Sequence, residues 1–145
     1  MTEPSLLVPG PAFDLVIGRT IDVPPELVWE AWTKPEHLER WFTPAPWWIE
    51  DCEVDLRPGG IFSVVMRGPE GDESVISGCY LDIVPIKRLV WTDALLTGFR
   101  PTENPFVTGI ITMEQSGAGT KYRAMARHRD SATSDEHKEM GFFEG

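Results

Sequence analysis

Polar and apolar residues alternate one by one over most of the middle of the chain, which is the pattern of half-buried β-strands. In the first such segment, residues 13–22, Leu15 and Ile17 fall on one side, and Asp14 and Thr20 fall on the other. The same alternation recurs in six later segments, separated by turns that often carry glycine or proline. These lie at residues 52–57, 61–67, 74–84, 89–93, 106–114 and 121–129. Consecutive strands with mostly short turns predict an antiparallel sheet of about seven strands.

Helical spacing of apolar residues is confined to three short segments. Pro25 suits a first helical turn and predicts a helix that begins there. Residues 33–36 have the Thr-x-x-Glu form of a capping box, which predicts a second short helix. Residues 133–145 return to helical spacing, with Ser134 as the expected N-cap. The chain is therefore predicted to be an α+β protein in the order strand, two short helices, six strands, helix.

The length of 145 residues and the 41% hydrophobic content predict one packed domain. We expect a flexible, proline-rich arm at residues 1–12 and a single domain at residues 13–145. A strand should separate the two cysteines, Cys52 and Cys79, so both are predicted to be reduced. Free thiols suggest a cytoplasmic location, and we find no signal peptide or membrane span in the sequence.

A net charge of −10 changes the list of plausible partners. Such a chain repels phosphate backbones and anionic lipid head groups, so we expect neither a nucleic-acid nor a membrane partner. The densest basic stretch, residues 121–129, alternates with apolar residues and fits the solvated face of a strand.

Several segments in sequence order resemble one known family. These are Pro-Glu-Leu-Val-Trp-Glu-Ala-Trp-Thr at 25–33, Pro-Glu-His-Leu-Glu-Arg-Trp-Phe at 35–42, Asp-Leu-Arg-Pro-Gly-Gly at 55–60, the pair at 78–83 and 88–92, and Met-Gly-Phe-Phe-Glu-Gly at 140–145. They resemble the bacterial relatives of the heat-shock-protein ATPase activators, within the START-like (SRPBCC) superfamily. The resemblance implies a helix-grip fold, in which the antiparallel sheet grips a C-terminal helix across a deep apolar cavity.

The final helix is short for this family. We therefore expect a homodimer that covers the mouth of the cavity, because a short helix should leave an apolar patch exposed. That patch should include Tyr122, Tyr80, Phe62 and Trp91. The alternative is that the arm at residues 1–12 folds over the opening within one chain.

The last strand supplies a local argument for a cavity. Its alternation turns Tyr122, Ala124, Ala126 and His128 inward, whereas Arg123, Met125 and Arg127 should face solvent. Small alanines leave room, either for a closely packed helix or for a ligand. Apolar pockets with a few polar anchors are typical of small-molecule sites. The candidate ligand-binding residues are Trp32, Trp41, Phe62, Val64, Met66, Tyr80, Trp91, Tyr122, His128 and Phe142.

Recognisable catalytic chemistry is absent from the sequence, so we assign no catalytic residue, metal ligand or cofactor. His128 could serve as a general base only if a carboxylate such as Asp93 or Glu73 oriented it. The alternative is a partly buried histidine with satisfied hydrogen bonds. His37 and His137 lie among charged residues and are expected to face solvent.

Three functions remain open. The favoured one is binding of a small apolar molecule in the cavity between the sheet and the C-terminal helix. The second is a chaperone-associated module that binds a protein surface, as the family resemblance implies. The third is a cyclase-like or hydrolase-like enzyme that acts inside the cavity. The sequence favours a binding protein over an enzyme.

Overall fold

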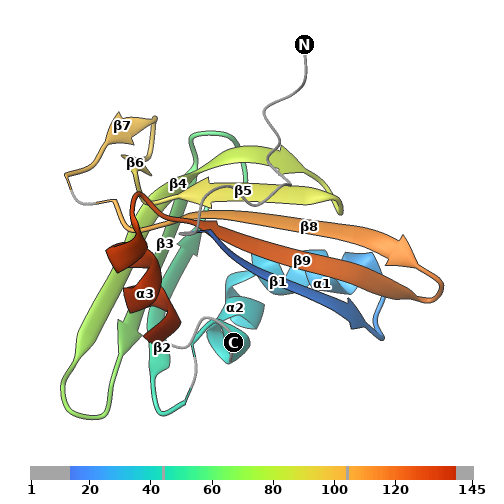
Figure 1. The fold of residues 1–145 in the computed structure, drawn as a ribbon, viewed down its shortest axis with the longest axis horizontal. Coiled ribbons are helices and arrows are strands. Elements are labelled where there is room, and N and C mark those ends of the chain that lie inside the picture. Colours follow the sequence, from blue (N-terminus) through green and yellow to red (C-terminus); the bar gives the residue numbers. More distant parts are fainter. Residues whose placement is uncertain (1–13, 44, 104, 140–145) are drawn as a thin grey trace.

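The computed structural model describes residues 14–43, 45–103 and 105–139, and the fold is drawn in Figure 1. The predicted arm at residues 1–12 lies outside the described residues. The elements, in order, are β1 (Leu15–Ile21), α1 (Pro25–Thr33), α2 (Pro35–Trp41), β2 (Trp48–Val54), β3 (Ile61–Arg67), β4 (Glu73–Val84), β5 (Arg88–Thr92), β6 (Leu95–Leu96), β7 (Arg100–Pro101), β8 (Thr108–Ser116), β9 (Gly119–Arg127) and α3 (Ser131–Glu139). This order confirms the predicted α+β helix-grip class.

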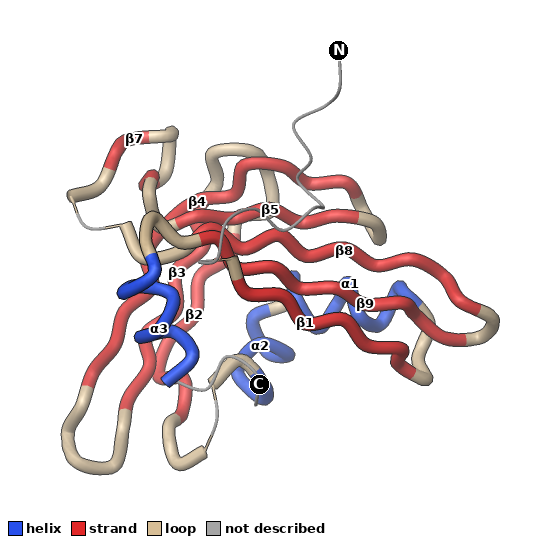
Figure 2. The backbone as a smooth tube through the Cα atoms, in the orientation of Figure 1, coloured by secondary structure: helices blue, strands red, loops and turns tan. Residues whose placement is uncertain are grey.

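Seven strands form one curled sheet in the order β1-β9-β8-β5-β4-β3-β2, and every pairing in it is antiparallel. The first strand of the chain, β1, therefore pairs with the last, β9, and Leu15 lies opposite Ala126. Figure 2 shows how the strands bend, so that β2 and β3 are steeply inclined to β8 and β9. The curl gives the sheet a concave face, and α1 and α2 lie across it.

The two short helices form a bent pair because Lys34 between them has an extended backbone. Pro25 occupies the first turn of α1, as predicted. The predicted capping box is wrong, since the hydroxyl of Thr33 donates to the carbonyl of Trp29, 2.8 Å away. The indole Nε1 of Trp41 donates to the carbonyl of Ala31 at 2.8 Å, which fastens α2 to α1.

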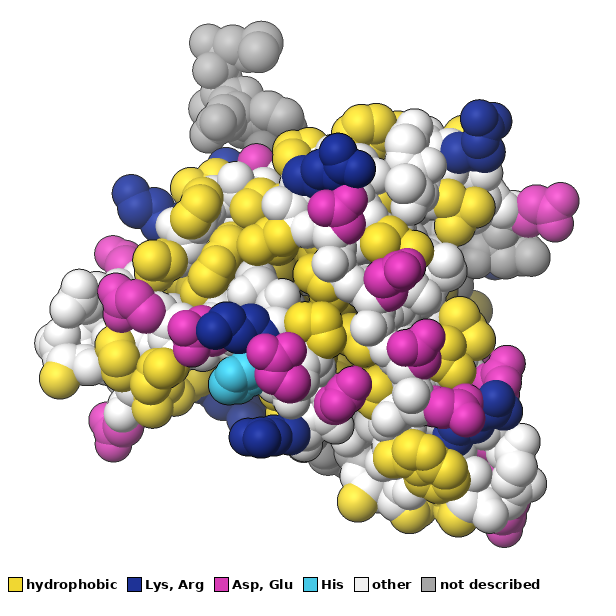
Figure 3. Space-filling view, turned by 180° about the vertical axis from the view of Figure 1, so that it is seen from behind, with side chains coloured by type: hydrophobic (Ala, Val, Ile, Leu, Met, Phe, Trp, Pro, Cys, Tyr) yellow, Lys and Arg dark blue, Asp and Glu magenta, His cyan; other side chains and the backbone are white. Residues whose placement is uncertain are grey.

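Apolar side chains are buried on both faces of the sheet. The main core lies between the concave face and helices α1 and α2, and includes Leu38 and Phe62. A smaller cluster on the other face contains Val90, Ile110 and Met125. The expectation that Met125 faces solvent is therefore wrong, because that side chain is 2% exposed among apolar neighbours. Figure 3 shows acidic side chains scattered among apolar ones over one outer face of the molecule.

Among the described residues, the four expected to form an exposed apolar patch beside the short final helix do not form one. Phe62 and Tyr80 are fully buried and Trp91 is 6% exposed, so only Tyr122 of the four is partly open. Aromatic packing explains the burial: Phe62 contacts Phe42 of the α2 terminus, Tyr80 and Trp91 with ring centroids 4.8–6.0 Å apart. The homodimer stays a prediction, without this support.

The C-terminal helix begins earlier than the sequence pattern indicates. Asp130 caps α3, because its Oδ1 accepts the backbone N–H of Thr133 at 2.8 Å and the Thr133 hydroxyl at 2.7 Å. The prediction of Ser134 as N-cap is wrong: it lies inside the helix and is buried. The remainder of the predicted helix, residues 140–145, falls outside the described part of the chain.

The segment at residues 94–105 contains the small hairpin of β6 and β7. Its turn folds back on the β2–β3 turn, where the Gly98 N–H donates to the Gly59 carbonyl at 2.9 Å. The side chain of Phe99 sits where a Cβ on Gly59 would clash with it. Cys52 and Cys79 are both free, as predicted, on strands β2 and β4 with β3 between them.

Candidate ligand-binding cavity

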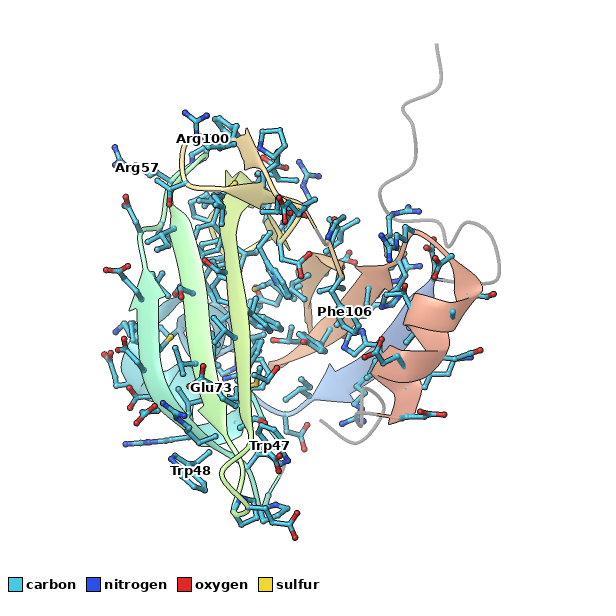
Figure 4. The ribbon with its side chains drawn as sticks, turned by 90° about the vertical axis from the view of Figure 1, so that its left-hand side faces the viewer. Trp47, Trp48, Arg57, Glu73, Arg100 and Phe106 are labelled. Atoms are coloured by element: carbon cyan, nitrogen blue, oxygen red, sulfur yellow. The ribbon has the colours of Figure 1, made fainter. Side chains whose placement is uncertain are left out.

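A partly open cavity of about 700 Å³ lies between the concave face of the sheet and the helices. In Figure 4, strands β2, β3 and β4 lie on one side of the molecule, and β1, β9 and α3 lie on the other. Its walls come from helices α1, α2 and α3 and from strands β1, β3, β4, β5, β8 and β9. Ala124 and Ala126 both line it. The sequence left open whether these small residues make room for a closely packed helix or for a ligand, and in the structure they border the cavity.

The structure divides the predicted ligand-binding residues into four groups. Those that line the cavity are Trp32, Trp41, Met66, Trp91 and Tyr122. Phe62, Val64 and Tyr80 are fully buried in the core and do not line it. His128 lies outside the lining, beneath α3. Phe142 lies outside the described residues. A direct role in ligand contact stays a prediction for the five lining residues and for Phe142.

Tyr122 and Trp32 form a polar contact within the apolar wall. The indole Nε1 of Trp32 donates to the hydroxyl oxygen of Tyr122 at 3.1 Å. This bond joins α1 to β9 across ninety positions of sequence. Burial raises the pKa of Tyr122, so the phenol stays protonated at neutral pH. Arg19 lies opposite Tyr122 in the strand register, and its side chain also lines the cavity.

A second polar region lies near the C-terminal end of β9, where His128 contacts His137. Here Asp93, Glu136 and His137 line the cavity. Burial raises the pKa of Asp93, although its Oδ1 accepts the backbone N–H groups of Phe106 and Val107 at 2.8 and 3.0 Å. These two bonds position the chain that leads into β8.

His128 and His137 form a pair that joins β9 to α3. His128 Nε2 and His137 Nδ1 are 2.8 Å apart, and the ring of Phe106 contacts both imidazoles. Figure 4 shows Phe106 between the sheet and α3. Burial, helped by the nearby His128, lowers the pKa of His137 to about 4. The expectation that His137 faces solvent is wrong, because the ring packs against the end of the sheet.

The arrangement around His128 bears on the general-base hypothesis. Asp93 is close enough for His128 to lower its pKa electrostatically, against the larger effect of burial. Glu73, the other suggested carboxylate, instead pairs with Arg67 at 2.6 Å. Among the described residues, no group of three or more His, Cys, Asp or Glu side chains is placed to hold a metal ion.

Sequence reasoning missed two features of the site. Arg19 was not singled out, although strand alternation puts Arg19 on the same side as Ile17 and Ile21. His137 was missed because its burial depends on where α3 docks. No local pattern in a polar nine-residue helix reports that position.

A curled antiparallel sheet, two short helices across its concave face and a C-terminal helix beside an apolar cavity define a START-like helix-grip protein. The family model described as "Activator of Hsp90 ATPase homolog 1-like protein" matches residues 22–145. The chain belongs to this family. No described helix is long and apolar enough to cross a membrane.

Solved structures show the same architecture. Protein NE0264 from Nitrosomonas europaea is 46% identical, with a TM-score of 0.86; the match covers 92% of this chain and 87% of that one. Protein Ms6760 from Mycobacterium smegmatis is 21% identical over 91% and 82% of the two chains, with a TM-score of 0.74. An AHSA1-like protein from Aeromonas hydrophila is 19% identical over 88% and 85%, with a TM-score of 0.68. No curated protein matches the sequence.

Proposed function

We propose that the protein binds a small hydrophobic molecule in the cavity between the sheet and its helices. The observation that carries this proposal is the partly open cavity of about 700 Å³, which lies within the size range of small-molecule sites. Its lining is mainly apolar, with Trp32, Trp41 and Trp91 among the walls. Rigid aromatic surface of this kind binds apolar ligands with little loss of side-chain entropy.

The cavity can be tested by filling it. Ala124 is buried and lines the cavity, whereas Ala132 on α3 is exposed and outside it. We expect the neutral fluorescent probe 1-aminoanthracene to bind the wild type saturably at one site. Ala124→Leu should weaken that binding about tenfold or more, because the added side chain occupies the probe's volume. Ala132→Leu is the matched control and should bind like the wild type.

Equal binding to the two variants, or binding that does not saturate, would contradict the proposal. Thermal unfolding of each variant should be recorded beside the titration, so that loss of fold is not read as loss of the site. Native mass spectrometry of freshly purified protein complements the titration, because it would reveal a retained molecule directly.

A second candidate function is docking onto a chaperone, which the family description suggests. One surface feature favours it. Leu56, Leu96 and Phe99 are each at least 38% exposed, at or beside the two turns joined by the hydrogen bond between Gly98 and Gly59. We call these three residues the turn patch. Phe99 holds a backbone φ of +65°, unfavourable for a residue with a side chain. Arg57 and Arg100 lie at the same end of the molecule (Figure 4).

The turn patch suits a partner surface that is apolar and acidic. Phe99→Asn should remove the aromatic anchor and still tolerate the positive φ, because asparagine adopts that conformation more readily than most residues. The readout is the ATPase rate of a purified bacterial Hsp90-type chaperone. We expect the wild type to stimulate it and Phe99→Asn to lose most of the stimulation. No stimulation by the wild type would contradict this candidate.

We further propose a cytoplasmic location and a homodimer. The free thiols of Cys52 and Cys79 support the first. Sedimentation equilibrium at micromolar concentration tests the second, and a species near 16.3 kDa would refute the dimer.

A further inference from the structure

The hydroxyl of Tyr122 is an oriented hydrogen-bond donor inside the cavity. Its oxygen already accepts the indole N–H of Trp32, so the bond fixes where the oxygen lies. The phenolic proton has no acceptor among the described residues, because the bond from Trp32 is the one hydrogen bond that this hydroxyl makes there. A phenol carries one donor and can also accept. The Trp32 contact therefore uses the acceptor and leaves the donor for a ligand.

The surroundings of Tyr122 make that donor significant. The side chain lines the cavity beside Trp32, and burial raises its pKa, so the proton is retained at neutral pH. A buried donor without an acceptor is unfavourable, whereas one that meets an acceptor in an apolar cavity gains more than in water. Ala124, two residues along β9, leaves space on the same wall.

The charge near Tyr122 narrows the choice of ligand. Arg19 lies opposite Tyr122 in the register and lowers the pKa of its hydroxyl electrostatically, against the larger effect of burial. A positive charge there disfavours an ammonium group. The far region of the cavity carries Asp93 and Glu136, which disfavour an anion at that position. An apolar molecule with an acceptor oxygen near Tyr122 satisfies both conditions.

We propose that the cavity selects apolar molecules that carry a carbonyl or ether oxygen, and that Tyr122 donates its hydroxyl proton to that oxygen while Trp32 holds the hydroxyl in place. This inference rests on the proposed binding function and adds the class of ligand. It identifies Tyr122 as the residue that gives specificity and Trp32 as a positioning residue.

Two matched probes test the inference. Benzophenone and diphenylmethane have the same two rings, and differ in that the first has a carbonyl where the second has a methylene. The quantity to measure is the ratio of the Kd of diphenylmethane to that of benzophenone. Tyr122→Phe should lower this ratio roughly threefold to tenfold, the size expected for one neutral hydrogen bond. The affinity for diphenylmethane should change little.

The chain offers a matched control, since it has two tyrosines. Tyr80 is fully buried, does not line the cavity, and its hydroxyl has no partner among the described residues. Tyr80→Phe should leave the ratio at its wild-type value. Infrared spectra of benzophenone labelled with ¹³C at the carbonyl give a second readout. The carbonyl stretch of the bound ketone should lie at lower frequency in the wild type than in Tyr122→Phe.

The outcomes separate the two levels of the proposal. A ratio that is the same in the wild type and Tyr122→Phe, with both probes bound, would overturn the assignment of ligand class and leave the cavity function intact. Failure of both probes to bind the wild type would overturn the cavity function and the assignment with it. A ratio that falls equally in Tyr80→Phe would also overturn the specific role of Tyr122.

Discussion

His128 Nε2 and His137 Nδ1 lie 2.8 Å apart, and this contact fastens the C-terminal helix to the end of the last strand. One imidazole must donate and the other accept, which neutral rings can do and a doubly protonated pair cannot. The groups near the pair include Asp93 and Asp130, as well as the ring of Phe106. The docking of α3 should therefore depend on pH.

The pKa of His137 predicts the direction of that dependence. Its folded value of about 4 lies below the ordinary 6.5, so the unfolded chain binds more protons between these values. The free energy of unfolding should fall as the pH drops from about 6.5 to about 4. Below pH 4 the contribution of His137 should no longer change. Because the ring is partly exposed, we expect a loss of about 1–2 kcal/mol.

Urea unfolding of the wild type and His137→Asn at pH 7.5 and pH 5 measures the contribution of His137. The effects of the other titrating groups cancel when the two proteins are compared. The wild type should lose more stability than the variant between the two pH values. The same loss in both proteins would show that His137 is not the responsible group.

Gly78 should not tolerate a side chain. A Cβ at this buried position of β4 would overlap the carbonyl oxygen of Thr92 on the neighbouring strand. We expect Gly78→Ala to destabilise the protein by about 3 kcal/mol or more, or to prevent folding. Gly18→Ala is the control, because the nearest atom to its Cβ would be 4.0 Å away. Thermal unfolding distinguishes them, and similar midpoints for the two variants would contradict the prediction.

Asp93 should matter through the two backbone N–H groups that its Oδ1 accepts. Asp93→Ala leaves the amides of Phe106 and Val107 without this acceptor, which we expect to cost about 2–4 kcal/mol. Asp93→Asn keeps a carbonyl acceptor in the same place and should recover most of that loss. Asp72→Ala, at an exposed turn, should lie within about 0.5 kcal/mol of the wild type. Urea denaturation provides the values, and an Asn variant as unstable as the Ala variant would argue against the role.

Both thiols should resist labelling until the protein unfolds. Cys79 is fully buried, and burial together with Glu39 and Asp51 raises the pKa of Cys52 to about 11. Because the thiolate is the reactive form, iodoacetamide at pH 8 should modify folded Cys52 far more slowly than a free thiol. Intact-mass analysis after unfolding without reductant should show two modified sites. An absence of modification would indicate a disulfide and contradict the structure.

Local sequence patterns predicted what depends on local spacing. The strand alternation placed all seven strands of the main sheet, and Pro25 marked the start of α1. The errors concern residues whose surroundings come from distant parts of the chain. The sequence predicted that Met125 faces solvent, because Arg123 and Arg127 lie on the same face of the strand. In the structure an apolar cluster on that outer face buries it. Thr33 and Ser134 both have side chains that commonly cap helices. The hydroxyl of Thr33 instead bonds to the carbonyl of Trp29, and Asp130 caps α3 ahead of Ser134.

The candidate site was predicted in part, for the same reason. Apolar and aromatic side chains indicated an apolar wall, and five of the ten predicted residues line the cavity: Trp32, Trp41, Met66, Trp91 and Tyr122. The bond between Trp32 and Tyr122 joins residues ninety positions apart, and no periodicity reports such a contact. The burial of His137 likewise follows from the docking of α3 onto the sheet.

The pairing of β1 with β9 has a consequence for synthesis on the ribosome. Leu15 pairs with Ala126, which is synthesised much later, so the sheet has a high contact order. Strand β1 therefore stays unpaired through most of translation. The strands from β2 to β5 can pair as they emerge, whereas β1 can be added to the main sheet only when β9 has left the exit tunnel. The half-built protein therefore exposes the apolar faces of both its first strand and its unfinished sheet, which leaves it prone to aggregation until β9 is made.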